Sequence, residues 1–196
     1  MNQVSPVVIW LNCYGGWDPK MRHPLETAGY HLYLDGIVQC LEPLQKRIQA
    51  VYLSGGMRDR FGRTECETTG VELHRRMQAR GMDREIIYDE ESVTTAGVVR
   101  KWVDTVSEKY PESSTILICD SARETINRNL AEYVAKKKKL DPAQWRWSIL
   151  ALPRPDITEQ STAAYQAEKW ERMQAEGIEI FDEKERVERL YKNKPY

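Results

Sequence analysis

Five short apolar runs, each followed by a segment with helical spacing, constrain the fold of this chain more than any other feature. Alternating strands and helices predict a parallel sheet covered by helices on both faces, because parallel strands need long crossover connections. Right-handed crossovers make this a Rossmann-like, doubly wound α/β fold, for which we expect the strand order 3-2-1-4-5. The expected strands are Val7–Leu11, Ala50–Leu53, Glu85–Tyr88, Thr115–Cys119 and Trp147–Leu152.

The length of 196 residues suits a single α/β domain, and we find neither an internal repeat nor a low-complexity linker. Helices are expected to end at Gly81 and near Lys136–Lys139, where a solvated basic run suits the helix dipole. After the fifth strand we expect a helix ending at Gly177, a short strand at Ile178–Phe181 and a charged helix at Glu183–Tyr191.

Composition excludes several classes of protein. With 29 basic and 30 acidic residues the net charge is −1, which argues against a nucleic-acid coat. No apolar run approaches the length of a membrane span, and the start of the chain lacks a signal-peptide pattern, so we expect a cytoplasmic protein without a membrane partner. The four cysteines form no C-x-x-C pair and are expected to be reduced, and the three histidines form no metal motif.

Ligands of open parallel sheets bind beyond the carboxyl ends of the strands, so the loops after the strands hold the candidate site. The first loop runs from Asn12 and is long; Gly15 lets the backbone approach a ligand, and Tyr14 is able to stack on a ring. A surface loop pinned by its aromatic residues is an equal alternative. The loops to inspect are Asn12–His23, Ser54–Arg63, Asp89–Thr95, Asp120–Arg123 and Pro153–Thr158.

The second loop combines Gly55-Gly56 with three arginines. Glycines directly after a strand expose backbone N–H groups, which predicts an anion cradle. Among the arginines, Arg58 lies closest to the strand end and is expected to contact the anion, whereas Arg60 and Arg63 are expected to be solvated.

Two helix starts carry acids and hydroxyls with competing explanations. Thr64 and Glu67 form a T-x-x-E pattern, which predicts a capping box and accounts for Glu67 without catalysis. In the third loop, Ser92 and Thr95 stand beside three acids, and helix capping competes there with ligand or metal binding.

The fourth loop reads D-S-A-R-E. Asp120 follows a strand and is expected to present its carboxylate at the ligand edge. Ser121 and Glu124 form a second capping-box pattern. Arg123 lies in the first helical turn, where the helix dipole disfavours a cation, so we expect an anionic partner: a protein carboxylate or a substrate phosphate or carboxylate.

Taken together, Ser54-Gly55-Gly56, Glu67 and the stretch Asp89–Thr95 resemble the YdcF/SanA/ElyC-like family, a domain family of largely unknown function. The likeness covers a core of residues 7–151 and leaves 152–196 as a C-terminal extension. Gly97 and Val98 stand where the family has Glu and Asn, and Arg123 stands at its histidine position. The resemblance implies the fold and makes S-adenosylmethionine a candidate ligand, but it carries over no catalytic scheme.

Three hypotheses follow. In the first, the protein is a hydrolase or transferase on a small anionic, phosphate- or nucleotide-bearing molecule, with Glu67 or Asp120 as general base or as ligand to a divalent metal. The second is a binding module for a nucleotide-like metabolite without chemistry, using the same cradle. The third is a scaffold whose charged C-terminal helix docks a partner; a homo-oligomer is compatible with each. The predicted contacts are Asn12, Tyr14, Gly15, Gly55, Gly56, Arg58, Ser92, Thr95, Ser121 and Arg123.

Overall fold

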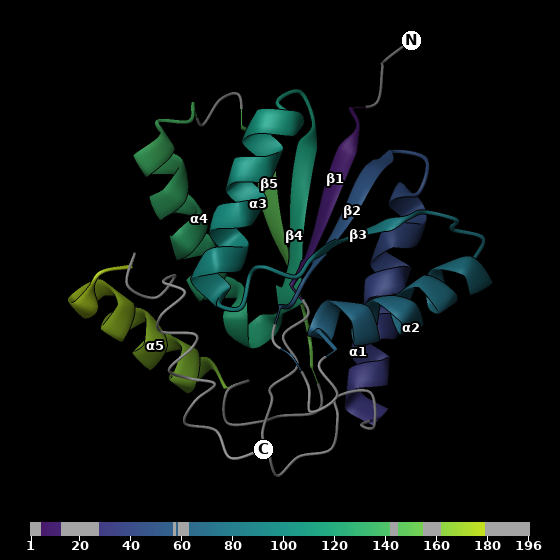
Figure 1. The fold of residues 1–196 in the computed structure, drawn as a ribbon, viewed down its shortest axis with the longest axis horizontal. Helices are drawn as coiled ribbons and strands as arrows, with labels where there is room; N and C mark the ends of the chain where they lie inside the picture. The colour runs from purple at the N-terminus through teal and green to yellow at the C-terminus, as the bar shows by residue number, and fades with distance from the viewer. Residues whose placement is uncertain are drawn as a thin grey trace.

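The fold is a parallel sheet of five strands flanked by helices (Figure 1). A computed structural model describes residues 5–12, 28–56, 58, 63–141, 145–154 and 162–178. The sheet order is β3-β2-β1-β4-β5 and each neighbouring pair is parallel, which confirms the predicted fold class and strand order. The strands are β1 (Val7–Asn12), β2 (Ile48–Ser54), β3 (Ile86–Asp89), β4 (Ser114–Asp120) and β5 (Trp147–Leu152).

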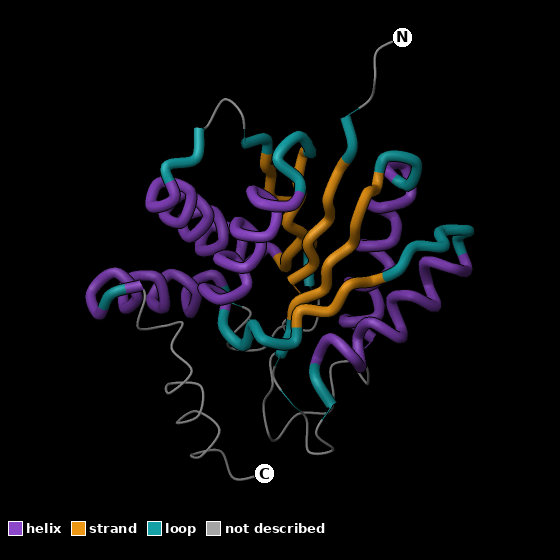
Figure 2. Tube along the Cα trace, turned by 45° about the horizontal axis from the view of Figure 1, so that its top comes forward, coloured by secondary structure: helices purple, strands orange, loops and turns teal. Residues whose placement is uncertain are grey.

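Helices cover both faces of the sheet (Figure 2), and since its strands are parallel their carboxyl ends lie at one edge. In Figure 1, α1 and α2 lie on one side of the sheet, and α3, α4 and α5 lie on the other. The helical elements are α1 (Ala28–Leu41), η2 (Glu42–Leu44), α2 (Glu65–Ala79), α3 (Thr95–Lys109), η3 (Ser121–Arg123), α4 (Glu124–Lys138) and α5 (Ala163–Glu176).

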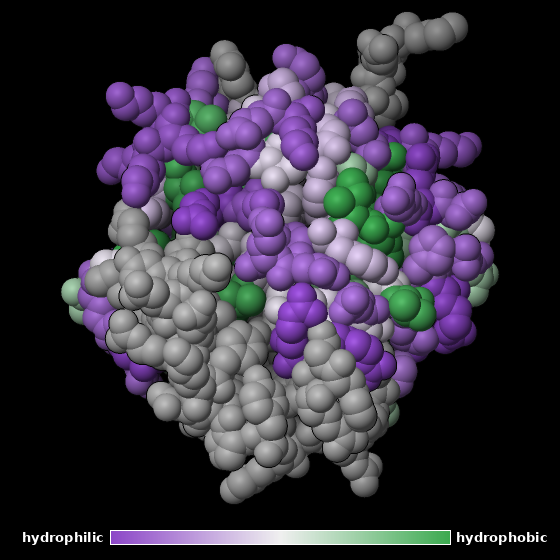
Figure 3. All heavy atoms as spheres, in the orientation of Figure 1, coloured by the Kyte–Doolittle hydropathy of each residue, from purple (hydrophilic) through white to green (hydrophobic). Residues whose placement is uncertain are grey.

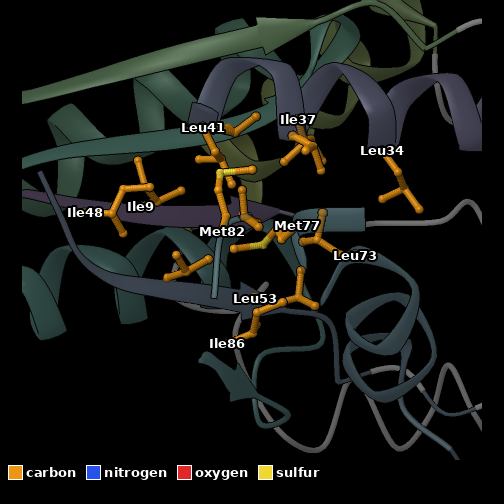
Figure 4. Close-up of a cluster of buried hydrophobic side chains, with 14 of the residues drawn as sticks. Ile9, Leu34, Ile37, Leu41, Ile48, Leu53, Leu73, Met77, Met82 and Ile86 are labelled. Atoms are coloured by element: carbon orange, nitrogen blue, oxygen red, sulfur yellow. The ribbon is translucent and has the colours of Figure 1, made fainter. Parts of the chain in front are cut away.

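Alternation along the strands divides the core into two layers. Ile9 and Leu53 pack with α1 and α2 on one face, where Leu34, Leu73 and Met77 interdigitate with them (Figure 4). On the other face the even-numbered residues of β1 join α3, α4 and α5 in a layer rich in tryptophan. β1, β2, β4 and β5 therefore contribute apolar side chains to both layers, as a sheet buried on both sides requires.

Four of the strands end later than the apolar runs predict. Asn12 pairs with Ser54 in the ladder, and Ser54 pairs with Asp89. Asp120 likewise belongs to β4 and pairs with Leu152. Hydrogen bonding between strands continues one residue beyond the hydrophobic pattern, so residues that the sequence places in loops or at their start are held by the sheet.

Several local predictions are confirmed. Gly81, with φ of 70°, follows α2, and the left-handed Lys139 ends α4 with its basic run exposed. The three described cysteines, Cys40, Cys66 and Cys119, are free thiols. The predicted strand at Ile178–Phe181 and the helix at Glu183–Tyr191 lie outside the described residues, apart from Ile178.

Figure 3 shows one face of the molecule, on which the described residues are mostly hydrophilic and the hydrophobic areas are small and separate. Within the described ranges, no helix combines the length and the apolar character that crossing a bilayer demands.

Candidate functional site

The candidate site lies where the carboxyl ends of β1 to β4 meet. Their last residues, Asn12, Ser54, Asp89 and Asp120, are all polar and all buried. β1 is flanked by β2 on one side and by β4 on the other, so the order of the chain reverses between β1 and β4. Ligands of doubly wound sheets bind in the crevice at such a switch point.

A chain of hydrogen bonds occupies the β1–β3 side of this edge. The Nε1 of Trp10 donates to the Oγ of Ser54 (2.8 Å), which donates to the Oδ2 of Asp89 (2.7 Å). The other oxygen of Asp89 accepts from the backbone N–H of Ser92 (3.3 Å). Both oxygens of Asp89 are therefore engaged within the protein, and the carboxylate anchors the loop that leads to α3.

The predicted anion cradle at Gly55 and Gly56 is not available as predicted. The N–H of Gly55 donates to the carbonyl of Asp89 (3.2 Å), and that of Gly56 donates to the carbonyl of Ser92 (2.9 Å). A Cβ at Gly56 would lie 2.3 Å from the carbonyl oxygen of Glu90. Close packing therefore explains both glycines: Gly56 approaches the loop after β3, and a Cβ at Gly55 would lie 2.9 Å from the Cβ of Glu65 in α2.

At the start of α2 the capping explanation is confirmed. The side chain of Thr64 accepts from the N–H of Glu67, and the Oε2 of Glu67 accepts from the N–H of Thr64 at 2.6 Å. The capping box therefore accounts for Glu67. Arg58 is exposed and its backbone pairs with Thr64, so its predicted contact with a ligand stays a prediction.

Capping also explains part of the third loop. Thr94 is the N-cap of α3 and accepts from the N–H of Gly97 at 3.0 Å. Thr95 is buried, and its hydroxyl accepts from the Nζ of Lys169 in α5 (2.9 Å). A cation from α5 therefore reaches the start of α3 at the ligand edge.

Arg123 has an anionic partner, which is a protein carboxylate, one of the two alternatives predicted. The Nη1 of Arg123 pairs with the Oδ2 of Asp120, and both side chains are buried. The predicted capping box of Ser121 and Glu124 is wrong: residues 121–123 form the short helix η3, and the N-cap residue of α4 is Arg123, without a side-chain cap. Ser121 is exposed, and Glu124 instead accepts from Arg128 at 2.9 Å.

Two side chains at the switch point have hydrogen-bonding capacity left over. Asn12 is 2% exposed, and among the described residues neither its Nδ2 nor its Oδ1 has a hydrogen-bond partner. Asp120 is 3% exposed, and its Oδ1 likewise has no partner in the described part of the chain. Buried polar atoms are nearly always hydrogen-bonded, so the candidate site at this edge is centred on Asn12 and Asp120.

The sequence analysis missed two charged residues at this edge. Glu65 is buried on the inner stripe of α2, and its spacing with Thr69 and Leu73 is the signal that places it there. Arg154 is buried two residues after β5, and its guanidinium lies 5.1 Å from the ring centre of Tyr30. The alternation through Leu150 and Leu152 predicts the face on which Arg154 lies.

Cys119 is not equipped as a nucleophile. Burial raises the pKa of its thiol to about 12. The thiolate, which is the reactive form, is therefore scarce at neutral pH. As for metals, the described ranges contain no group of three or more His, Cys, Asp and Glu side chains placed to hold an ion.

A groove of about 250 Å³ lies elsewhere, between α3 and α4. Two of its charged groups pair with each other, since the Nζ of Lys138 lies 2.7 Å from the Oδ1 of Asp104. The strand ends therefore remain the better candidate site. Two predicted contacts, Tyr14 and Gly15, fall outside the described residues.

Comparisons of the chain with protein-family models, with curated proteins and with solved structures found no match. The resemblance to the YdcF/SanA/ElyC-like family therefore stays a prediction. Since one fold serves many functions, function has to be inferred from the residues at the strand ends.

Proposed function

We propose that the protein binds a small, anionic, phosphate- or nucleotide-bearing molecule at the carboxyl edge of its sheet. The observation that carries this proposal is the pair Asn12 and Asp120, whose buried polar atoms lack partners among the described residues at the switch point. Leaving such an atom unsatisfied costs about 1–3 kcal/mol. A ligand that bonds these atoms recovers that free energy, and selection for binding explains why the cost is retained.

Positive charge on the β4–β5 side supports an anionic ligand. Arg123, which is paired with Asp120, and Arg154 are both buried near the ends of β4 and β5, and Lys169 reaches the start of α3. Arginine binds phosphate and carboxylate groups through paired, charge-assisted hydrogen bonds. The anionic group is therefore assigned to this half of the edge, rather than to Gly55 and Gly56.

Catalysis is the second candidate, and the geometry of Asp120 favours it. One oxygen of this carboxylate is held by Arg123, whereas Oδ1 has no partner in the described chain. A positioned carboxylate oxygen is able to take a proton from a water or a ligand hydroxyl, which is the general-base step of a hydrolase or transferase. Glu67 is the weaker candidate base because its carboxylate caps α2.

Ligand-induced stabilisation tests the proposal. The full chain is heated with adenosine 5′-monophosphate, ATP, S-adenosylmethionine or ribose 5-phosphate, and binding is measured by calorimetry for any compound that raises Tm. Ligand at about 100 times its Kd stabilises the folded state by about 2.7 kcal/mol. Failure of every compound to raise Tm contradicts the proposal, whereas binding without turnover of the phosphate-bearing compounds favours the non-catalytic function.

A further inference from the structure

The unsatisfied atoms at the switch point differ in what they require from a ligand. As a carboxylate oxygen, the Oδ1 of Asp120 only accepts hydrogen bonds, whereas the carboxamide of Asn12 accepts through Oδ1 and donates through Nδ2. A group bound there therefore has to donate at two places and accept at one. Hydroxyl groups satisfy both requirements, because each donates one hydrogen bond and accepts others.

A phosphate group does not fit this place. Its ionised oxygens are acceptors, so they leave the Oδ1 of Asp120 without a donor. Its negative charge also lies beside a buried carboxylate, where the low dielectric strengthens repulsion. The arginine that offsets this charge, Arg123, is already paired with Asp120. The phosphate therefore lies further along the edge, on the side of β5.

The two side chains also begin on opposite faces of the sheet. Asn12 continues the alternation of Val8 and Trp10, which belong to the layer under α3 and α4. Asp120 continues the alternation of Ile116 and Ile118 along β4, and these two residues belong to the layer under α1 and α2. A ligand group that forms hydrogen bonds with both residues has to extend across the ends of β1 and β4. A single hydroxyl is too small for this, whereas a ring with several hydroxyls is large enough.

Resting on the proposed function, we infer that the ligand places a sugar ring, of the ribose type, across the ends of β1 and β4. Asp120 accepts a hydrogen bond from one ring hydroxyl and Asn12 exchanges hydrogen bonds with another. The switch point is thus the sugar subsite, and the anionic group lies on its β5 side.

Hydroxyl deletion in the ligand tests this assignment. Calorimetry measures Kd of the full chain for adenosine 5′-monophosphate, for its 2′-deoxy and 3′-deoxy forms, for ribose 5-phosphate and for inorganic phosphate. A hydrogen bond to a charged group contributes about 1.5–3 kcal/mol, so deleting the hydroxyl that faces Asp120 should weaken binding at least tenfold. Inorganic phosphate should bind more weakly than either sugar phosphate.

Variants assign the effect to residues. In Asp120→Asn, the amide oxygen still accepts a hydrogen bond but carries no charge, so the ratio of Kd values for the deoxy and hydroxyl ligands should fall by about threefold or more. Asp104→Asn makes the same chemical change at an ion pair between α3 and α4, and its ratio should equal that of the natural sequence. If the loss of the Arg123 pair prevents Asp120→Asn from folding, Asn12→Leu provides the readout, since it removes no ion pair.

Each outcome is decisive. Equal binding of the deoxy and hydroxyl ligands refutes the sugar subsite and leaves the proposed function standing. Tight binding of inorganic phosphate alone places the anion at the switch point and also refutes it. If none of the compounds binds, both the sugar subsite and the proposed function are wrong.

Discussion

Asn12→Leu should make the protein more stable while it impairs the site. The side chain is buried, its two polar atoms have no partner among the described residues, and its neighbours on the same face of β1 are Val8 and Trp10. Replacing an unsatisfied amide by an apolar side chain of similar size removes a desolvation cost of about 1–3 kcal/mol. For a chain of 150–250 residues, each kcal/mol moves Tm by about 2–4 °C, so the expected rise is roughly 2–12 °C.

Thermal and urea unfolding without ligand measure this change, and Thr115→Val is the matched control. Thr115 is buried in β4, accepts from the Nε1 of Trp102 (2.8 Å) and donates to the carbonyl of Val8 (3.1 Å). Its loss leaves an indole donor unsatisfied, so Tm should fall. If Asn12→Leu lowers Tm as Thr115→Val does, the Asn12 amide is satisfied in the folded protein and the assignment of the site loses its basis.

Three further changes have defined outcomes. Ser54→Ala interrupts the bonds from Trp10 and to Asp89, and urea unfolding should show a loss of about 1–3 kcal/mol; an unchanged midpoint would contradict it. Gly56→Ala sets a Cβ 2.3 Å from a backbone oxygen, so a loss of about 1–3 kcal/mol or more is expected in the same assay, and a neutral effect would disprove close packing. Hydrogen bonds from Arg75 and Arg76 lower the pKa of Glu72 from 4.5 to about 2, so its contribution to stability is present above pH 4.5 and is lost as the pH falls towards 2. As the pH falls over this range, Tm should therefore decrease less steeply in Glu72→Gln than in the natural sequence. Parallel profiles for the two proteins would refute this contribution of Glu72.

The fold was predictable because its signals are local and repeated. Each strand is a short apolar run followed by a helical pattern, and the rules of handedness leave few ways to arrange five such units. The ends of the strands were less predictable. Asn12 and Asp89 are polar, so the hydrophobic pattern stops before them, but each pairs with Ser54 in the ladder.

The sequence predicts where the candidate site lies, but it does not predict the role of each residue there. The switch-point rule selects the edge at which these buried polar residues gather, and the position of Asp120 after a strand places it there. The role of Gly55 was less predictable, because backbone N–H groups that seem available after a strand donate to Asp89, which is distant in sequence. The local T-x-x-E pattern draws attention to Glu67. Glu65 is the buried acid, and its burial depends on how α2 packs on the sheet.

The central place of β1 has a consequence for the order of folding. Val7 pairs with Ile48 on one side and with Ser114 on the other, so the second neighbour of β1 is synthesised long after the first. During translation, β1, β2 and β3 emerge together with α1 and α2. The helix α3, which covers the other face of β1, and the strand β4, which pairs with its other edge, are synthesised later. Such non-local pairing is slow, since loop closure precedes the contacts that stabilise it. Asp120 joins Asn12 only when β4 docks. A ligand that needs both residues therefore recognises the completed sheet, and its presence in the cell favours finished chains over partly folded ones.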